Sequence, residues 1–181
     1  LEGDERFKVN LQFGLENLQA CIAESDLFIL HQPSNQQLEA VAPSKKARWI
    51  LVGPQTDISA LQQEAGIGIY DQFEPTFNTL NAGFTLFSTP EGLDDFISKA
   101  NPLIGPFGKF SILQSYTPLL FKQVRDIKTN DPSWYFQERN ESKQAVTMGV
   151  NLWRWRVENY RQQSNFQIFD ALVRSTITYL S

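Results

Sequence analysis

The sequence predicts an α/β fold whose sheet is mostly parallel. Residues 27–30 and 49–52 are continuous apolar runs of strand length, which is typical of strands covered on both faces. Strand-breaking residues follow each run: His31-Gln32-Pro33-Ser34 after the first and Gly53-Pro54 after the second. Helical patterns lie before, between and after the two runs. This alternation favours a parallel sheet in which both strands are adjacent and central.

Three helices are predicted around these strands. Leu11, Leu15, Leu18 and Ile22 recur at helical spacing and draw one apolar stripe over residues 10–24. A short polar helix over residues 36–41 lies between the strands. After the second strand, Thr56 or Asp57 can cap a helix that carries Ile58 and Leu61.

The second half predicts shorter strands, some of them antiparallel, separated by Gly, Pro and Asn. A strand over residues 145–148 is expected to run parallel to the two early strands. A polar stretch over 137–143 predicts an exposed hairpin connection. The other strand candidates are residues 77–80, 83–88, 110–115, 119–124 and 134–136.

Three more helices are expected in this half. Thr89-Pro90-Glu91 has the N-cap, first-turn proline and acidic residue of a helix start. Leu93, Phe96 and Ile97 give that helix its buried side. Helices over 151–163 and 166–180 end the chain, and the last carries a core-facing stripe of Phe166, Phe169, Leu172, Val173, Ile177 and Leu180.

Length and composition exclude several classes of protein. The 181 residues fit one domain spanning 1–181, and 41% apolar residues are enough for a core. A formal charge of −4 without a basic run argues against a nucleic-acid partner. The apolar runs are far shorter than the roughly 20 residues of a membrane helix, so a membrane is reached only through segments outside this chain. No glycine-rich nucleotide motif is present, and no cofactor is predicted.

The one cysteine, Cys21, and the one histidine, His31, leave no disulfide and no Cys- or His-rich metal site. They are also poorly placed as a catalytic pair. Cys21 ends a helix at the start of the following strand, whereas His31 follows that strand's far end, on the order of 15 Å away. We therefore predict no catalytic residue and no metal ligand, and we interpret Cys21 as a small buried thiol.

The best candidate site lies at the carboxyl ends of the predicted parallel strands, where open α/β sheets place their ligands. A structural turn is the competing interpretation, because no nucleophile elbow follows residues 49–52. The candidate binding residues at this edge are His31, Gln32, Gly53, Gln55, Thr56, Asp57, Gly149 and Asn151.

The string Trp153-Arg154-Trp155-Arg156 is the most distinctive in the sequence, and it adds Trp153, Arg154 and Arg156 to the candidate binding residues. Successive helical residues point about 100° apart, so at least one tryptophan must face the core. Core packing with a surface ion pair and a binding surface are both open interpretations. We expect this helix to begin at the same sheet edge as Gly53 and His31, where its N-terminus and its arginines favour an anionic or acceptor-rich ligand.

Four segments together resemble a known family: residues 25–34, 49–53, 149–156 and 179–181. The chain resembles the class I glutamine amidotransferase-like domain of membrane-anchored, von Willebrand factor A-like envelope proteins of Bacteroidetes. The resemblance implies a flavodoxin-like three-layer sandwich excised from a larger protein, on the periplasmic side of the cell envelope, with no established activity. The cysteine after the central strand and the downstream His-x-Glu of true amidotransferases are missing.

These observations favour a non-catalytic interaction or ligand-binding module, with an envelope protein or a small acceptor-rich ligand as its partner. One alternative is a hydrolase of the amidotransferase-like superfamily with an unconventional site around His31, Gln55 and Asp57. Another is a carbohydrate-binding domain, in which Trp153 or Trp134 would face solvent beside amide and carboxylate side chains.

Overall fold

A computed structural model describes residues 6–57, 59–61, 67–68, 72–107, 111–112, 114–124, 127–139 and 141–181. The helices of these ranges are α1 (Leu18–Glu24), α2 (Asn35–Val41), η1 (Ala42–Ser44), α4 (Leu93–Lys99), α5 (Leu152–Gln163) and α6 (Gln167–Leu180). The strands are β1 (Leu27–His31), β2 (Ala47–Leu51), β3 (Ile67–Gly68), β4 (Phe73–Leu80), β5 (Leu103–Pro106), β6 (Ser111–Ile112), β7 (Tyr116–Val124), β8 (Ile127–Arg139) and β9 (Ser142–Thr147).

The main sheet has the strand order β1-β2-β9-β8-β7-β4-β5. Only the β1–β2 and β2–β9 pairs are parallel, and the pairs from β9 to β5 are antiparallel. The predicted mostly parallel, flavodoxin-like sheet is therefore wrong, and the fold is a mixed α/β fold. The physical reason is that short connections join β7 to β8 and β8 to β9, and a short connection can only join antiparallel strands.

The early strands are adjacent and parallel as predicted, with Ile29 opposite Trp49. They are not both central, because β1 lies at one end of the strand order. β9 runs parallel to β2, as expected for residues 145–148. Trp49, Ile50 and Val52 are buried, whereas Ile29 on β1 is 42% exposed, so β1 is not covered on both faces.

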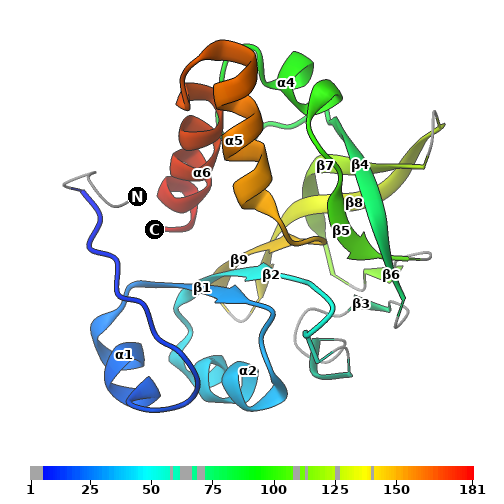
Figure 1. The fold of residues 1–181 in the computed structure, drawn as a ribbon. Coiled ribbons are helices and arrows are strands. Elements are labelled where there is room, and N and C mark those ends of the chain that lie inside the picture. The colour runs from blue at the N-terminus through cyan, green and yellow to red at the C-terminus, as the bar shows by residue number, and fades with distance from the viewer. Residues whose placement is uncertain are drawn as a thin grey trace.

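Helices lie on both sides of the sheet and cover both faces of β2 and β9 (Figure 1). On one face α4, α5 and α6 enclose the main core, which includes Trp49, Trp134 and Trp155. On the other face α2 and residues 59–61 cover a second core with Ile50 and Val146.

The antiparallel half curls back on itself, because β5 reaches Val150, in the segment between β9 and α5. Ile104 and Val150 exchange two backbone hydrogen bonds, with N···O distances of 3.0 and 3.2 Å. A β-carbon on Gly105 would lie 2.5 Å from the Met148 carbonyl oxygen, so only glycine permits this approach.

Several predicted elements differ in extent. The helix expected over 10–24 begins only at Leu18, because Gly14 and Asn17 adopt left-handed backbone conformations. Residues 83–88 form no strand. Phe84 and Phe87 instead pack edge-on against each other and both contact Phe136.

The hairpin connection is shorter than the predicted 137–143, because β8 extends to Arg139 and β9 starts at Ser142. Gln137 and Ser142 are buried, whereas Glu141 is exposed. Within 110–115 only β6 is a described strand, and residues 110 and 113 lie outside the described residues.

The remaining helices follow the sequence pattern. α2 begins one residue earlier than expected, behind a Ser34–Gln37 capping box. α4 buries the predicted Leu93, Phe96 and Ile97. It begins at Leu93, with Gly92 as its N-cap residue, and so starts later than the predicted Thr89-Pro90-Glu91. α5 and α6 each begin one residue later than predicted. Leu61 is buried as a helical residue, and Ile58 lies outside the described residues.

Candidate functional site

Three segments of the predicted site meet around Gly53, at the carboxyl edge of β1, β2 and β9. A β-carbon on Gly53 would lie 2.4 Å from Val150 Cγ1 and 2.5 Å from Gln32 Oε1. The backbone N–H of Gln55 donates to that same Gln32 oxygen at 3.1 Å. The structure therefore brings together the ends of all three strands, as the parallel arrangement predicted.

The turn after β2 uses its polar groups internally. The Gly53 N–H donates to Thr56 Oγ1 at 2.9 Å, and the Thr56 N–H donates to the Gly53 carbonyl at 2.9 Å. The Asp57 N–H donates to the Pro33 carbonyl, which ties this turn to the end of β1. These bonds fit the interpretation of residues 53–57 as a structural turn.

Asp57 caps the helical residues 59–61. Its Oδ1 accepts from the Ser59 hydroxyl at 2.7 Å and from the Ala60 N–H at 3.2 Å. These hydrogen bonds lower the pKa of Asp57 from its ordinary value, and the bond from the Ser59 hydroxyl has the largest effect. The carboxylate is thus engaged in a helix cap, and no hydrogen bond joins it to His31 within the described ranges.

Cys21 and His31 stand apart. The Cys21 thiol is partly exposed, and its closest polar partner is Gln12 Oε1, at 3.6 Å. The exposed His31 forms no hydrogen bond to Cys21 or Gln55 among the residues that the structure describes. The predicted small buried thiol is therefore wrong in its burial, because the shortened α1 leaves Cys21 near the surface.

The segment from Gly149 to Asn151 carries the chain from the sheet edge into α5. A β-carbon on Gly149 would lie 2.8 Å from Leu103 Cβ, so this position needs glycine. Asn151 precedes the helix in a left-handed conformation, with φ of 80° and no side-chain capping bond. Since Val150 lies against Gly53, α5 begins at the predicted edge.

The Trp-Arg-Trp-Arg string divides between core and surface. Trp155 is fully buried, donates from Nε1 to the Asn101 carbonyl at 2.6 Å, and meets Phe96 edge-on. Trp153 is 62% exposed, with the Arg154 guanidinium 5.4 Å from its ring centroid. Trp155 therefore packs in the core, whereas Trp153 is exposed, and its role as a binding surface stays a prediction.

Arg156 forms the expected surface ion pair. Its Nε and Nη2 donate to the two Asp170 oxygens at 2.9 and 3.3 Å, and its guanidinium lies 3.9 Å from the Phe166 ring centroid. The bond to Asp170 raises the pKa of Arg156. The pair links α5 to α6 across their surface.

Apart from Leu152 and Trp155, which face the main core, the α5 helix has an inverted polarity. Glu158 and Asn159 are buried, whereas Trp153, Val157 and Tyr160 are exposed. Glu158 accepts from Asn101, Arg161 and Gln162. Asn159 Oδ1 accepts from the Phe169 N–H at 3.0 Å, while its buried Nδ2 has no hydrogen-bond partner among the described residues. We name Trp153, Val157 and Tyr160 the α5 face. Their spacing of four and three residues was visible in the sequence, but the sequence did not reveal that this side faces outward.

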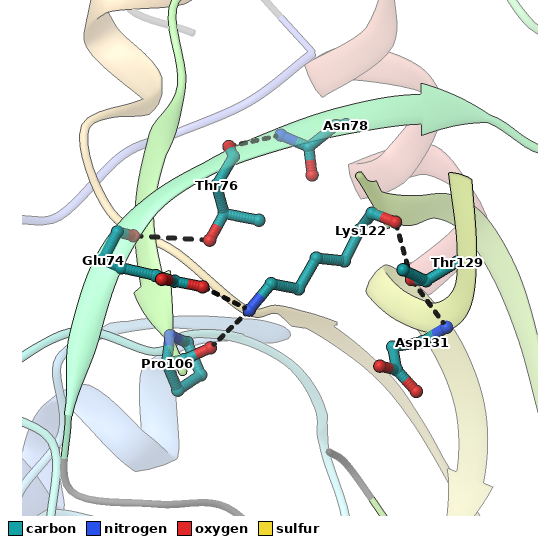
Figure 2. A network of polar contacts seen from close by, with 7 residues as sticks. All are labelled: Glu74, Thr76, Asn78, Pro106, Lys122, Thr129 and Asp131. Carbon is teal, nitrogen blue, oxygen red and sulfur yellow. Dashed lines mark hydrogen bonds and ion pairs between the residues drawn. The ribbon is translucent and has the colours of Figure 1, made fainter. Parts of the chain in front are cut away.

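A second polar cluster, not predicted from sequence, lies inside the curl of β4, β5, β7 and β8 (Figure 2). The Lys122 side chain is 4% exposed, and its Nζ lies 3.0 Å from Glu74 Oε1 and 3.3 Å from the Pro106 carbonyl. Asn78 donates to the Thr76 carbonyl at 3.2 Å, while its buried Oδ1 has no partner. The sequence did contain one indication of this cluster: Lys122 interrupts the apolar run 119–124. A charged side chain inside a buried strand usually has a polar or charged partner, because burying an unpaired charge is costly.

Within the described ranges, no three His, Cys, Asp or Glu side chains gather in a way that could hold a metal ion. Nor does any helix in these ranges have the length and apolar character needed to cross a membrane.

Geometrically, the chain is a mixed α/β domain with a structured turn at the carboxyl edge and an apolar helix face beside it. It matches no family model and no curated protein. It is similar in fold to cytoplasmic protein STM1381 of Salmonella typhimurium LT2, with a TM-score of 0.55 and 10% identity over 88% of this chain and 74% of that one. It is also similar to cytoplasmic protein STM3548 of Salmonella typhimurium, with a TM-score of 0.54 and 12% identity over 94% and 76%.

Both similar structures are named as cytoplasmic proteins, which contradicts the envelope location expected from the family resemblance. The resemblance to the amidotransferase-like domain itself stays a prediction. At these identities the two likenesses show the fold alone.

Proposed function

We propose that this chain is a non-catalytic protein-interaction module that binds its partner through the α5 face. The observation that carries the proposal is the row of three large apolar side chains that α5 exposes in addition to its core-facing Trp155. A surface helix normally turns its apolar stripe to the core, because burial of apolar area stabilises the fold. Here Trp153, Val157 and Tyr160 are 62%, 56% and 52% exposed, while a glutamate and an asparagine are buried.

The charges around the α5 face indicate an acidic partner. Arg154, Arg156 and Arg161 lie on the same helix, in a protein of net charge −4. Arg156 and Arg161 have carboxylate partners within the chain, but Arg154 forms no ion pair with the described residues. Tryptophan, tyrosine and arginine are the residues that most often dominate binding energy. An acidic amphipathic helix, with its own apolar stripe on Trp153 and Val157, fits this surface.

Fewer observations support the two alternative functions, a hydrolase and a carbohydrate-binding domain. In the hydrolase alternative, the Asp57 carboxylate is occupied by its capping bonds, and His31 forms no hydrogen bond to Gln55 or Asp57 among the described residues. In the carbohydrate alternative, Trp134 is fully buried against Trp49, with ring centroids 5.0 Å apart. Only Trp153 remains as an exposed platform for a sugar.

The proposal is tested by selecting displayed helical peptides, both acidic and basic, on the purified protein. The selected peptides should be acidic, and Trp153→Ala should weaken their binding by at least about tenfold. Ile127→Ala is the matched control, since Ile127 is 70% exposed on β8. Selection of basic peptides, or equal binding to Trp153→Ala and wild type, would overturn the proposal. Binding of cello- or chito-oligosaccharides that is lost in Trp153→Ala would favour the carbohydrate alternative instead.

A further inference from the structure

The outer edge of β1 has the composition of a strand that needs a second neighbour. In the described part of the chain, β1 pairs only with β2, and Leu27-Phe28-Ile29-Leu30 contains no charge, proline or bulge that would protect an open edge. Ile29 is 42% exposed on this strand. The opposite end of the sheet differs, because β5 is closed by the Ile104–Val150 bridge. The β1 edge is therefore an acceptor for a further strand.

The chain also exposes a segment with the pattern of a strand. Val9, Leu11, Phe13 and Leu15 alternate with polar residues or glycine, and they are 40%, 74%, 84% and 46% exposed. Strict alternation of this kind is the pattern of a half-buried strand. Yet no backbone–backbone hydrogen bond joins residues 7–14 to another described residue. We name residues 8–13 the donor segment.

We propose that the donor segment of one copy of this chain adds to the β1 edge of a second copy, as a strand parallel to β1. The register that places Leu11 beside Ile29 also places Val9 beside Leu27 and Phe13 beside His31. The three donor side chains then lie on the exposed face of β1, since paired positions share a face. The exchange satisfies backbone groups of both partners, as in other strand-addition complexes.

Charge favours this direction. In the parallel register Lys8 lies beside Asp26, and both side chains are exposed in the single chain. In the antiparallel register with the same central pair, Lys8 would lie beside Gln32 and Asp26 beside Gly14, so neither charge would gain a partner. The parallel arrangement also extends the parallel set of β1, β2 and β9.

The donor segment of a second copy is favoured as the strand that pairs with β1, because the chain's own donor segment is held in place at both ends. Phe7 packs against the main core before the segment, and Gly14 and Asn17 turn the backbone after it. The segment is thereby kept extended and open to another molecule. Two copies can exchange segments reciprocally about a two-fold axis.

Sedimentation of the whole chain tests the assembly. The wild type should form a dimer, and Ile29→Lys and Leu11→Lys should each raise its dissociation constant by at least about tenfold. Ile127→Lys is the matched control, because Ile127 is an exposed apolar residue outside both segments, and it should change nothing. A wild type that stays monomeric at every concentration overturns the proposal.

The register is tested by charge exchange and cross-linking. Lys8→Glu should weaken the dimer, and adding Asp26→Lys should restore it. In a Cys21→Ala background, a tagged Leu11→Cys chain mixed with an Ile29→Cys chain should form a disulfide-linked pair, whereas Leu11→Cys mixed with Ile127→Cys should not. Equal cross-linking of both mixtures overturns the register. A cross-link that forms only within a doubly substituted single chain overturns the second copy as the occupant.

Discussion

Replacement of Trp155 and Trp153 by alanine tests whether the Trp-Arg-Trp-Arg string divides between core and surface. The two positions have the same residue type on one helix, two residues apart, and differ in burial: Trp155 is 0% exposed and Trp153 is 62% exposed. Local helix propensity therefore changes equally in both variants. Any difference in the free energy of unfolding reports tertiary packing.

The structure sets the magnitude expected for Trp155→Ala. Truncation of a fully buried large aromatic side chain costs about 3–5 kcal/mol, and the cost rises with the cavity that remains. About 1 kcal/mol of this belongs to the hydrogen bond from Nε1 to the Asn101 carbonyl, and a similar amount to the edge-on contact with Phe96. Trp155→Phe keeps an aromatic ring at this site and should cost less than Trp155→Ala.

Trp153→Ala should change the free energy of unfolding by no more than about 0.5 kcal/mol, because the side chain is largely in water. Urea unfolding followed by circular dichroism measures all three variants, with the slope m as a check that the unfolded state is unchanged. For a chain of this length, the loss in Trp155→Ala lowers the melting temperature by roughly 6–20 °C. Equal losses for Trp153→Ala and Trp155→Ala would refute the assignment of the two residues to surface and core.

Three further changes probe other parts of the molecule. Gly53→Ala should lower the free energy of unfolding by about 1–3 kcal/mol in urea titrations, since its β-carbon would overlap the groups that converge there; an unchanged midpoint would mean that this edge is loosely packed. Glu158→Gln should destabilise the protein at neutral pH. Hydrogen bonds to the Glu158 carboxylate, of which the one from Arg161 has the largest effect, hold its pKa below the ordinary 4.5. The stabilisation from a lowered folded-state pKa is fully present above the unfolded value and is lost as pH falls through the folded value. The melting temperatures of wild type and variant should therefore begin to converge below about pH 4.5 and meet only below the lowered pKa, and parallel curves would contradict the ion pair. Lys122→Met removes the bonds to Glu74 and the Pro106 carbonyl while keeping the length of the chain, and should cost about 1–3 kcal/mol by calorimetry; a more stable variant would show that desolvation of the lysine outweighs its bonds.

The spacing of apolar residues correctly predicted those helices and strands whose buried side can be identified from the element's own sequence. The stripe of Phe169, Leu172, Ile177 and Leu180 is buried on α6, and Leu93 with Phe96 is buried on α4. Glycine and proline marked the ends of β1 and β2 correctly. In these cases the side chains that define the pattern are also the ones that make the tertiary contact.

The sheet's direction and order could not be predicted in the same way. Residues 119–124 and 134–136 belong to strands β7 and β8, whose pairing depends on the short connections between them rather than on their apolar content. The place of β1 at the sheet edge is also non-local, since its composition is that of a central strand.

The sequence predicted where the candidate site lies better than it predicted what its side chains do. The ends of β1, β2 and β9 do converge at Gly53, because parallel strands end at one edge. The capping role of Asp57 and the outward face of α5 depend on side-chain geometry that the spacing alone does not contain. The cluster around Lys122 was missed because its partners come from other strands, Glu74 on β4 and the Pro106 carbonyl on β5, which lie 48 and 16 residues away in sequence.

The position of β9 also has a consequence for how the chain folds. Among the strands that the structure describes, β9 alone joins the parallel pair β1–β2 to the antiparallel strands β8, β7, β4 and β5. Its residues, Ser142–Thr147, leave the ribosome long after β1 and β2 have been made. Until then the two early strands can pair with each other but have no place in the sheet, and their apolar side chains stay in water. Such late, long-range closure slows folding and prolongs the exposure of aggregation-prone strands, so this domain should depend on chaperones during synthesis more than its size suggests.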